Sequence, residues 1–286
     1  MRRGVVIPSL FLAVALAATA RGDDLDTVTA RVKADLTAAA YSTATTNSLL
    51  ASLGADGRWS DVDYADTSQT GWSQQTHLTR MLYLSRAYAS PTHSLSGSPT
   101  LLAGILKAYD AFVALDPRST NWWYNEINTP QLLGGTILLV QPQLTAAQIT
   151  SGTTIVARSY IPRSTNAGTN TGTNRMDRAY ASILRGLIAR DAALTAESFG
   201  AIADTLVVTT SEGIQPDFSF HQHGPQLNNG SYGLTFASLS LDVTSYAVGT
   251  GYALADAESR AIVDYLLDGQ QWMLRGRSKS QSATLC

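Results

Sequence analysis

Three things are scarce in this sequence of 286 residues: cysteine, excess charge of either sign and long apolar runs. The only cysteine is Cys286, the last residue, so no internal disulfide can form and packing must stabilise the fold. The formal net charge of −2 lacks the basic excess on which nucleic-acid binding depends, so we expect no nucleic-acid partner. The single long apolar run lies near the N-terminus and is shorter than the roughly 20 residues of a membrane span.

The N-terminal stretch MRRGVVIPSLFLAVALAATA has the three parts of a secretory signal peptide. Two arginines precede an apolar run from Val5 to about Ala18, and Ala18-Thr19-Ala20 is a cleavage site of the A-x-A type. We therefore predict a signal peptide over residues 1–20 and a secreted, extracellular protein without membrane contact after cleavage. An uncleaved N-terminal anchor is the alternative. The remaining residues fit one large domain.

Apolar residues recur at helical spacing along most of the chain. Leu25, Val28, Val32 and Leu36 form one such stripe. Similar patterns occupy residues 78–88, 101–113, 130–139, 180–188, 201–208 and 262–267. Because the alternation typical of strands is sparse, we predict an all-α fold of about eight to twelve helices in antiparallel pairs.

Three polar segments interrupt the helical patterns: STNWWYNEINTP, STNAGTNTGTNRMD and FSFHQHGPQLNNGSYG. They are rich in Asn, Gly, Thr and aromatic residues, and each one alone is typical of a solvated loop. Functional residues concentrate on loops that a rigid scaffold holds in place. We therefore predict that the three segments converge on one rim of a helical toroid.

The common signatures of serine hydrolases, zinc peptidases and phosphate-binding loops are missing from the sequence. His221 and His223 have the spacing of a metal pair, but no third ligand lies near them, so we expect neither a metal nor a cofactor. Four acidic residues in or beside the polar segments lack a spacing that would mark paired catalytic carboxylates: Glu126, Asp177, Glu212 and Asp217.

Tandem tryptophans and a set of Asn, His and Tyr side chains are what these segments do contain. Trp122 and Trp123 suit stacking against the face of a sugar; the alternative is that one or both belong to the core. Asn and His can hydrogen-bond a carboxylate, and a tyrosine exchanges protons once its pKa is lowered. These groups favour removal of a proton next to a carboxyl group, as in β-elimination on a uronic acid.

Four blocks are similar to the polysaccharide lyases of family eight, which are the hyaluronate, chondroitin AC and xanthan lyases: NWWYNEINTPQLLGGTILL, TGTNRMDRAYASILRGLI, EGIQPDFSFHQHGPQLNNGSYG and LRGRS. The resemblance extends from about Trp59 to Arg277. It implies an incomplete α/α toroid over residues 21–277 with an anionic-glycan cleft on its rim, β-sandwich domains beyond the toroid, and an irregular tail over residues 278–286. Two departures are that Gln281 stands where the family has a second arginine, and that the 286 residues include no β-sandwich part.

The resemblance also implies roles for individual residues. Asn174 in TGTNR would bind the uronate carboxyl group together with His223, the second histidine of HQH. Tyr232 in NGSYG would take the proton from C5 and return one to the leaving O4. Arg277 in LRGRS would hold that tyrosine as a phenolate. His221 is expected to be structural.

Five further residues are expected to bind the polysaccharide: Asn121, Trp122, Trp123, Asn128 and Arg175. For Arg175, anchoring of the helix that follows Asn174 is an equal alternative. Together with the predicted signal peptide, the resemblance implies a secreted lyase that acts on an acidic polysaccharide of the hyaluronan, chondroitin or xanthan type. We expect this lyase to be a monomer. A glycan-binding toroid with little or no activity, and a glycoside hydrolase on an α/α toroid, are the alternatives.

Overall fold

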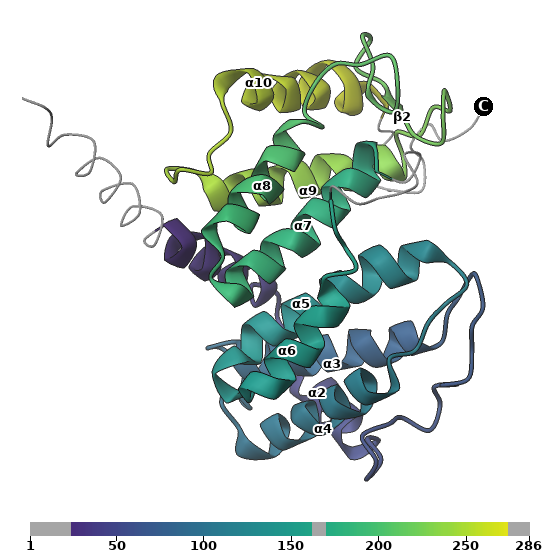
Figure 1. The fold of residues 1–286 in the computed structure, drawn as a ribbon, viewed down its shortest axis with the longest axis vertical. Coiled ribbons are helices and arrows are strands. Elements are labelled where there is room, and N and C mark those ends of the chain that lie inside the picture. Colours follow the sequence, from purple (N-terminus) through teal and green to yellow (C-terminus); the bar gives the residue numbers. More distant parts are fainter. Residues whose placement is uncertain (1–23, 162–169, 274–286) are drawn as a thin grey trace, which may run out of the picture.

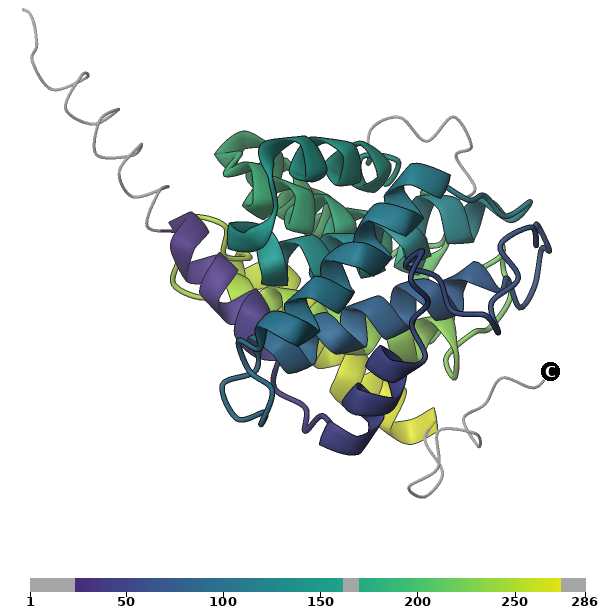
Figure 2. The same cartoon turned by 90° about the horizontal axis from the view of Figure 1, so that it is seen from below.

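The computed structural model describes residues 24–161 and 170–273, and Figures 1 and 2 show their arrangement from two sides. A helix over residues 24–36 comes first. The helices that follow are α2 (Thr43–Ala51), α3 (Gln74–Ala89), α4 (Pro99–Leu115), the π-helix η1 (Tyr124–Asn128), α5 (Thr129–Val140), the 3-10 helix η2 (Gln141–Gln143), α6 (Ala146–Val156), α7 (Gly172–Ala189), α8 (Ala192–Ala203), α9 (Tyr232–Ala247), α10 (Asp256–Asp264), the π-helix η4 (Tyr265–Gln270) and α11 (Gln271–Met273).

The only sheet in the described residues is one antiparallel pair, β1 (Gly213–Ile214) with β2 (Phe220–His221). The prediction of an all-α fold is therefore confirmed. Among the described residues, none of the helices is both long enough and apolar enough to cross a membrane.

Local capping chemistry explains where several helices begin. The Ser98 side chain accepts a hydrogen bond from the backbone N–H of Leu101 (3.3 Å), and Pro99 occupies the first turn of α4, where a missing N–H has no consequence. At the start of α6, Thr145 and Gln148 bond each other's backbone N–H groups and so form a capping box. These helix starts follow from the sequence because each cap lies within three residues of the groups that it satisfies.

Several neighbouring helices in the chain pack in pairs, namely α3 with α4, α5 with α6 and α7 with α8, and α5 and α7 lie in the middle of the molecule (Figure 1). Helix α5 contacts α3, α6 and α7, while α7 also contacts α8 and α9. Ile137 of α5 and Leu184 of α7 are fully buried. Because α7 touches helices from both halves of the chain, its first turn can bring residues from distant segments together.

The helix over residues 24–36 packs against the end of α9, more than two hundred residues later in the chain. The Arg31 guanidinium donates to the carbonyl oxygens of Tyr246 (2.8 Å) and Val248 (2.6 Å). The Tyr246 hydroxyl donates to the Asp35 carboxylate (2.7 Å). These hydrogen bonds join the first described helix to the C-terminal half of the fold.

Two sequence predictions need correction. Residues 201–208 do not form one helix, because α8 ends at Ala203 and Val208 pairs with Ile214 in an isolated bridge. Apolar spacing over a few residues does not separate helical from extended backbone, and β-branched valines favour the latter. The segment STNWWYNEINTP is also not a loop throughout. It is helical from residue 122, because the Asn121 side chain accepts from the Trp123 N–H (3.0 Å) as an N-cap.

Candidate active site

Asn174 lies in the first turn of α7, at its third residue. Only 2% of its surface is exposed, and its Oδ1 atom is buried without a hydrogen-bond partner among the described residues. A buried amide oxygen without a partner is unfavourable by about 1–3 kcal/mol. The hydrogen-bonding capacity of the Asn174 amide oxygen is therefore unused within the described residues.

His223 and Tyr232 come from the same irregular segment and lie next to each other. Their rings are 4.9 Å apart between centroids and meet edge to face at 89°. His223 has a left-handed backbone (φ 63°), which is uncommon for a residue other than glycine, and Tyr232 begins α9. His221, by contrast, lies in β2 and pairs with Gly213. The turn chemistry of the segment thus brings one histidine, and not the other, against the tyrosine.

The loop between these residues is fixed from inside. Asn229 is fully buried, and its Oδ1 accepts a hydrogen bond from the Phe220 N–H (2.6 Å). The Asn228 carbonyl accepts from the Gly233 N–H (2.8 Å), which lies just inside α9. Tyr232 is therefore held at the N-terminus of α9 by backbone hydrogen bonds as well as by its ring contact with His223.

A cavity of about 220 Å³ opens beside Tyr232. Its lining combines one indole, three hydroxyls, one phenol and one carboxyl group: Trp123, Thr173, Ser231, Thr235, Tyr232 and Asp177. Burial raises the pKa of Asp177 to about 6, although a hydrogen bond from Gln131 opposes that shift. Burial also raises the pKa of Tyr232, and the carboxylates of Asp177 and Glu212 raise it further. Because these effects raise the pKa of Tyr232 above its ordinary value of 10.0, its phenol is neutral at neutral pH.

Asp177 is the site residue that sequence reasoning dismissed. It follows Asn174 by three residues, a spacing that places both side chains on the same face of a helix. Recognition that α7 begins at residue 172, rather than after a loop, would have revealed this pairing.

The tandem tryptophans are both partly exposed but face different partners. Trp123 lines the cavity with Tyr232. The Trp122 ring lies against the Arg178 guanidinium, with 5.3 Å from Cζ to the ring centroid, and Arg178 forms an ion pair with Glu126 (2.5 Å). The structure therefore brings one of the two indoles to the tyrosine and leaves the other beside a buried cation.

The other predicted binding residues are placed as follows. Asn121 uses its amide within the protein, since Nδ2 donates to the Gln69 carbonyl (3.0 Å) while Oδ1 caps the helix. The Oδ1 atom of Asn128 is buried without a hydrogen-bond partner in the described part of the chain. Arg175 forms an ion pair with Asp204 (2.7 Å), which supports its role as a helix anchor. Arg277 lies outside the described residues.

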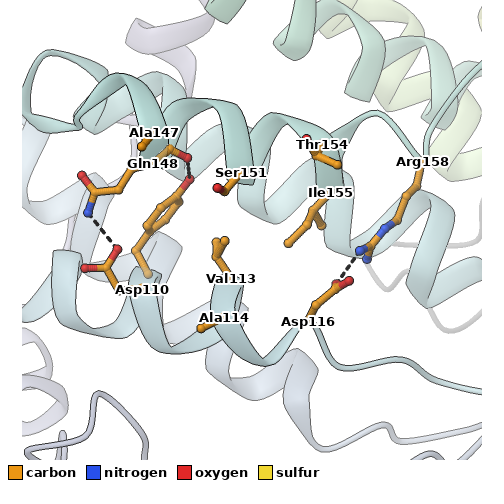
Figure 3. A pocket seen from close by; sticks show the side chains of 11 residues that line it. Asp110, Val113, Ala114, Asp116, Ala147, Gln148, Ser151, Thr154, Ile155 and Arg158 are labelled. Atoms are coloured by element: carbon orange, nitrogen blue, oxygen red, sulfur yellow. Dashed lines mark hydrogen bonds and ion pairs between the residues drawn. The ribbon is translucent and has the colours of Figure 1, made fainter.

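A larger groove of about 600 Å³ runs between α4 and α6 and contains none of the predicted site residues (Figure 3). The Gln148 side chain bridges to Asp110 (2.7 Å), and Arg158 forms an ion pair with Asp116. The first contact joins the two helices, and the second joins the residues just beyond their C-terminal ends. In the described residues, no group of three or more His, Cys, Asp or Glu side chains is arranged to hold a metal ion.

The helical fold corresponds to a known class of proteins that act on polysaccharides. Residues 16–279 match the family model for the N-terminal alpha-helical domain of polysaccharide lyase family 8. The chain therefore belongs to that family, and the predicted resemblance is confirmed.

Individual relatives agree with this assignment. Over 231 residues the chain is 32% identical to a chondroitinase-AC of Pedobacter heparinus. The matched region covers 79% of this chain and 32% of that protein. A hyaluronate lyase of Thermasporomyces composti is 25% identical over 211 residues, covering 72% of this chain and 26% of that protein. The chain thus spans about a third or less of the length of these relatives.

Solved structures show the same fold. A chondroitinase AC lyase superimposes with a TM-score of 0.80 at 29% identity, over 88% of this chain and 37% of that one. A chondroitin AC lyase of Streptomyces coelicolor, solved with chondroitin sulphate, gives 0.78 at 21% identity, over 88% of this chain and 37% of that one. The predicted α/α toroid is confirmed by these neighbours.

Proposed function

We propose that this chain is the toroidal part of a secreted lyase that cleaves a uronic-acid-containing polysaccharide by β-elimination. The observation that carries the proposal is the edge-to-face contact of His223 with Tyr232, 4.9 Å between ring centroids, beside a cavity lined by an indole, hydroxyl groups and a carboxyl group. The names of the relatives support a substrate of the chondroitin, hyaluronan or xanthan type. We expect the protein to act as a monomer.

The proposed reaction begins with the uronate carboxyl group, which Asn174 and His223 bind through hydrogen bonds. This interaction disperses the negative charge that develops as the C5 proton leaves. Tyr232 accepts that proton, the electron pair of the C5–H bond forms the C4=C5 double bond, and the C4–O4 bond breaks. The leaving O4 then takes a proton from Tyr232. No atom is added, in contrast to hydrolysis, where water is consumed.

Tyr232 needs help to act as a base, because burial and two nearby carboxylates raise the pKa of its phenol. A positive charge next to the phenol would oppose that shift. Arg277 is the cation that we propose for this task. The hydroxyl and indole groups around the cavity would position the sugar, since a few polar groups in an otherwise apolar pocket fix the orientation of a ligand.

The test is the substitution Tyr232→Phe, assayed by ultraviolet absorption of the conjugated C4=C5 product on hyaluronan, chondroitin and xanthan. Loss of a positioned acid and base lowers the rate by about 10²–10⁴-fold, whereas affinity for the polysaccharide should change little. Tyr88→Phe on α3, which removes a phenol outside the cavity lining, is the matched control.

Each outcome of this assay separates the candidate functions. Absorbing products that depend on Tyr232 support the lyase. New reducing ends without ultraviolet absorption would instead show a glycoside hydrolase, and retention of polysaccharide without any product would show a glycan-binding toroid. A Tyr232→Phe protein that kept near-parental kcat would overturn the proposed role of the phenol.

A further inference from the structure

Gln222 stands between the two histidines of the site segment and is fully buried. Both ends of its side chain are engaged. The Oε1 atom accepts a hydrogen bond from the backbone N–H of Thr173 (3.1 Å), and Nε2 donates to the carboxylate of Glu212 (2.5 Å). A fully buried glutamine with a hydrogen bond at each end of its amide fixes the distance between the two segments that it joins, which here carry Thr173 and Glu212.

Glu212 extends the connection on the other side of His223. Its Oε1 atom accepts from the Gly224 N–H (2.7 Å), and Oε2 accepts from the Thr171 hydroxyl (2.5 Å) as well as from Gln222. The residues immediately before and after His223 are therefore both tied to one carboxylate. These two hydrogen bonds support the left-handed backbone conformation of His223. A residue with a Cβ atom keeps this conformation when the surrounding structure holds it.

The first turn of α7 is the third partner. Thr171 occupies the N-cap position but makes no side-chain cap bond, and its hydroxyl donates to Glu212. Gln222 instead satisfies the free N–H of Thr173, one of the donors that every helix start leaves unpaired. The Thr173 hydroxyl donates in turn to the Tyr232 carbonyl (3.0 Å).

Gly172 shows how closely these segments approach. It has φ +50°, and a Cβ atom built on it would lie 2.3 Å from Oε1 of Gln222. A side chain at this position would push the glutamine away from the helix start. The glycine next to the helix start is therefore needed for the contact between α7 and the histidine segment.

We propose that Gln222 and Glu212 are positioning residues, which hold the segments of Asn174, His223 and Tyr232 in one fixed arrangement. The two side chains bond to residue 173, next to Asn174, and to residue 224, next to His223, and the bond from Thr173 continues the connection to Tyr232. This inference rests on the proposed lyase function. It adds the residues that set the geometry on which the reaction depends, without a contact of their own to substrate.

The first experiment replaces Gln222 by methionine, which has similar length and cannot make either hydrogen bond. Misplacement of reacting groups by about 1 Å lowers the rate by about 10²-fold, so we expect kcat to fall about that much while KM changes by less than about threefold. The matched control is Gln141→Met, because Gln141 also donates from its amide to α7, but to the Ile188 carbonyl at the opposite end (2.8 Å). If Gln222 were merely structural, both variants would have a lower Tm than the parent, and neither would have a lower kcat per folded molecule.

A charge exchange between the two residues gives an independent test. Gln222→Glu places two carboxylates where the 2.5 Å hydrogen bond stood and should lower kcat further than methionine does. Adding Glu212→Gln restores a donor and an acceptor across this contact, and the new carboxylate at position 222 still accepts from Thr173. Recovery of at least tenfold in kcat by the double variant is expected. A double variant as slow as Gln222→Glu would overturn the proposal.

Hydrogen exchange makes the test independent of catalysis. The amides of Thr173 and Gly224 donate to Gln222 and Glu212, so both should exchange faster in Gln222→Met than in the parent and in Gln141→Met. If the parent chain produced no eliminated product, the proposed lyase function would fail, and these two amides would still decide whether the segments are coupled. Unchanged exchange at both amides would refute the coupling.

Discussion

Asp177→Asn provides a quantitative test of the electrostatics of the site. Only 9% of Asp177 is exposed, and burial raises the pKa of its carboxyl group from 3.8 to about 6. Because the folded protein holds the proton more tightly than the unfolded chain, the ionised carboxyl destabilises the fold above pH 6. That destabilisation is relieved as the pH falls through about 6 towards 3.8.

The magnitude follows from the size of the shift. About two pKa units correspond to roughly 3 kcal/mol at most, at 1.36 kcal/mol per unit. Asparagine has the same shape, and its Oδ1 atom can keep the hydrogen bond from Gln131 (3.0 Å) that Asp177 now accepts. We therefore expect Asp177→Asn to raise the free energy of unfolding at pH 7.5 by up to about 3 kcal/mol, with a much smaller gain near pH 4.

The assay is urea denaturation of the parent and the variant at several pH values between 4 and 8, since the difference between the two proteins cancels the titration of every other group. Asp217→Asn is the control of opposite sign, because hydrogen bonds from Ser219 lower the pKa of Asp217. That variant should be less stable than the parent by nearly the same amount at every pH between 4 and 8, because the stabilisation by the ionised Asp217 carboxylate is lost only below its ordinary pKa of 3.8. A stability gain of Asp177→Asn that was equal at pH 4 and pH 7.5, or a loss at pH 7.5, would refute the reasoning.

Two further predictions concern the chemical step. Asn174→Ala should lower kcat more than it raises KM, because a hydrogen bond to the uronate carboxylate strengthens as charge builds up in the transition state; a raised KM with unchanged kcat would make Asn174 an ordinary binding residue. Treatment of an active preparation with a strong chelator, followed by its removal, should leave the rate of ultraviolet-absorbing product unchanged, because amide, imidazole and guanidinium groups are proposed to bind the carboxylate. Activity that vanished and returned only with calcium or manganese would overturn that mechanism and direct attention to His221 and His223 as ligands.

Much of the fold was predictable because its causes are local. The stripe of Leu25, Val28, Val32 and Leu36 predicted a helix that the structure contains over residues 24–36, with all four side chains buried. The caps of α4 and α6 lie within a few residues of the helix starts that they satisfy. The resemblance to the lyase family, carried by the motifs HQH and NGSYG, singled out His223 and Tyr232, and the structure brings these two into ring contact.

Tertiary packing decided what lies around that pair. Helical periodicity states which face of a helix is apolar but not which distant segment covers it. One cavity is lined by Trp123, which directly precedes η1, by Asp177 of α7 and by Tyr232 of α9. Only the packing of α7 against η1 and α9 places these three side chains around it. The pKa of Asp177 depends on that burial, so no spacing in the sequence could reveal it. The bonds of Gln222 and Glu212 to the start of α7 also join segments forty or more residues apart, where hydrogen-bond partners follow from the folded arrangement and not from local residue pattern.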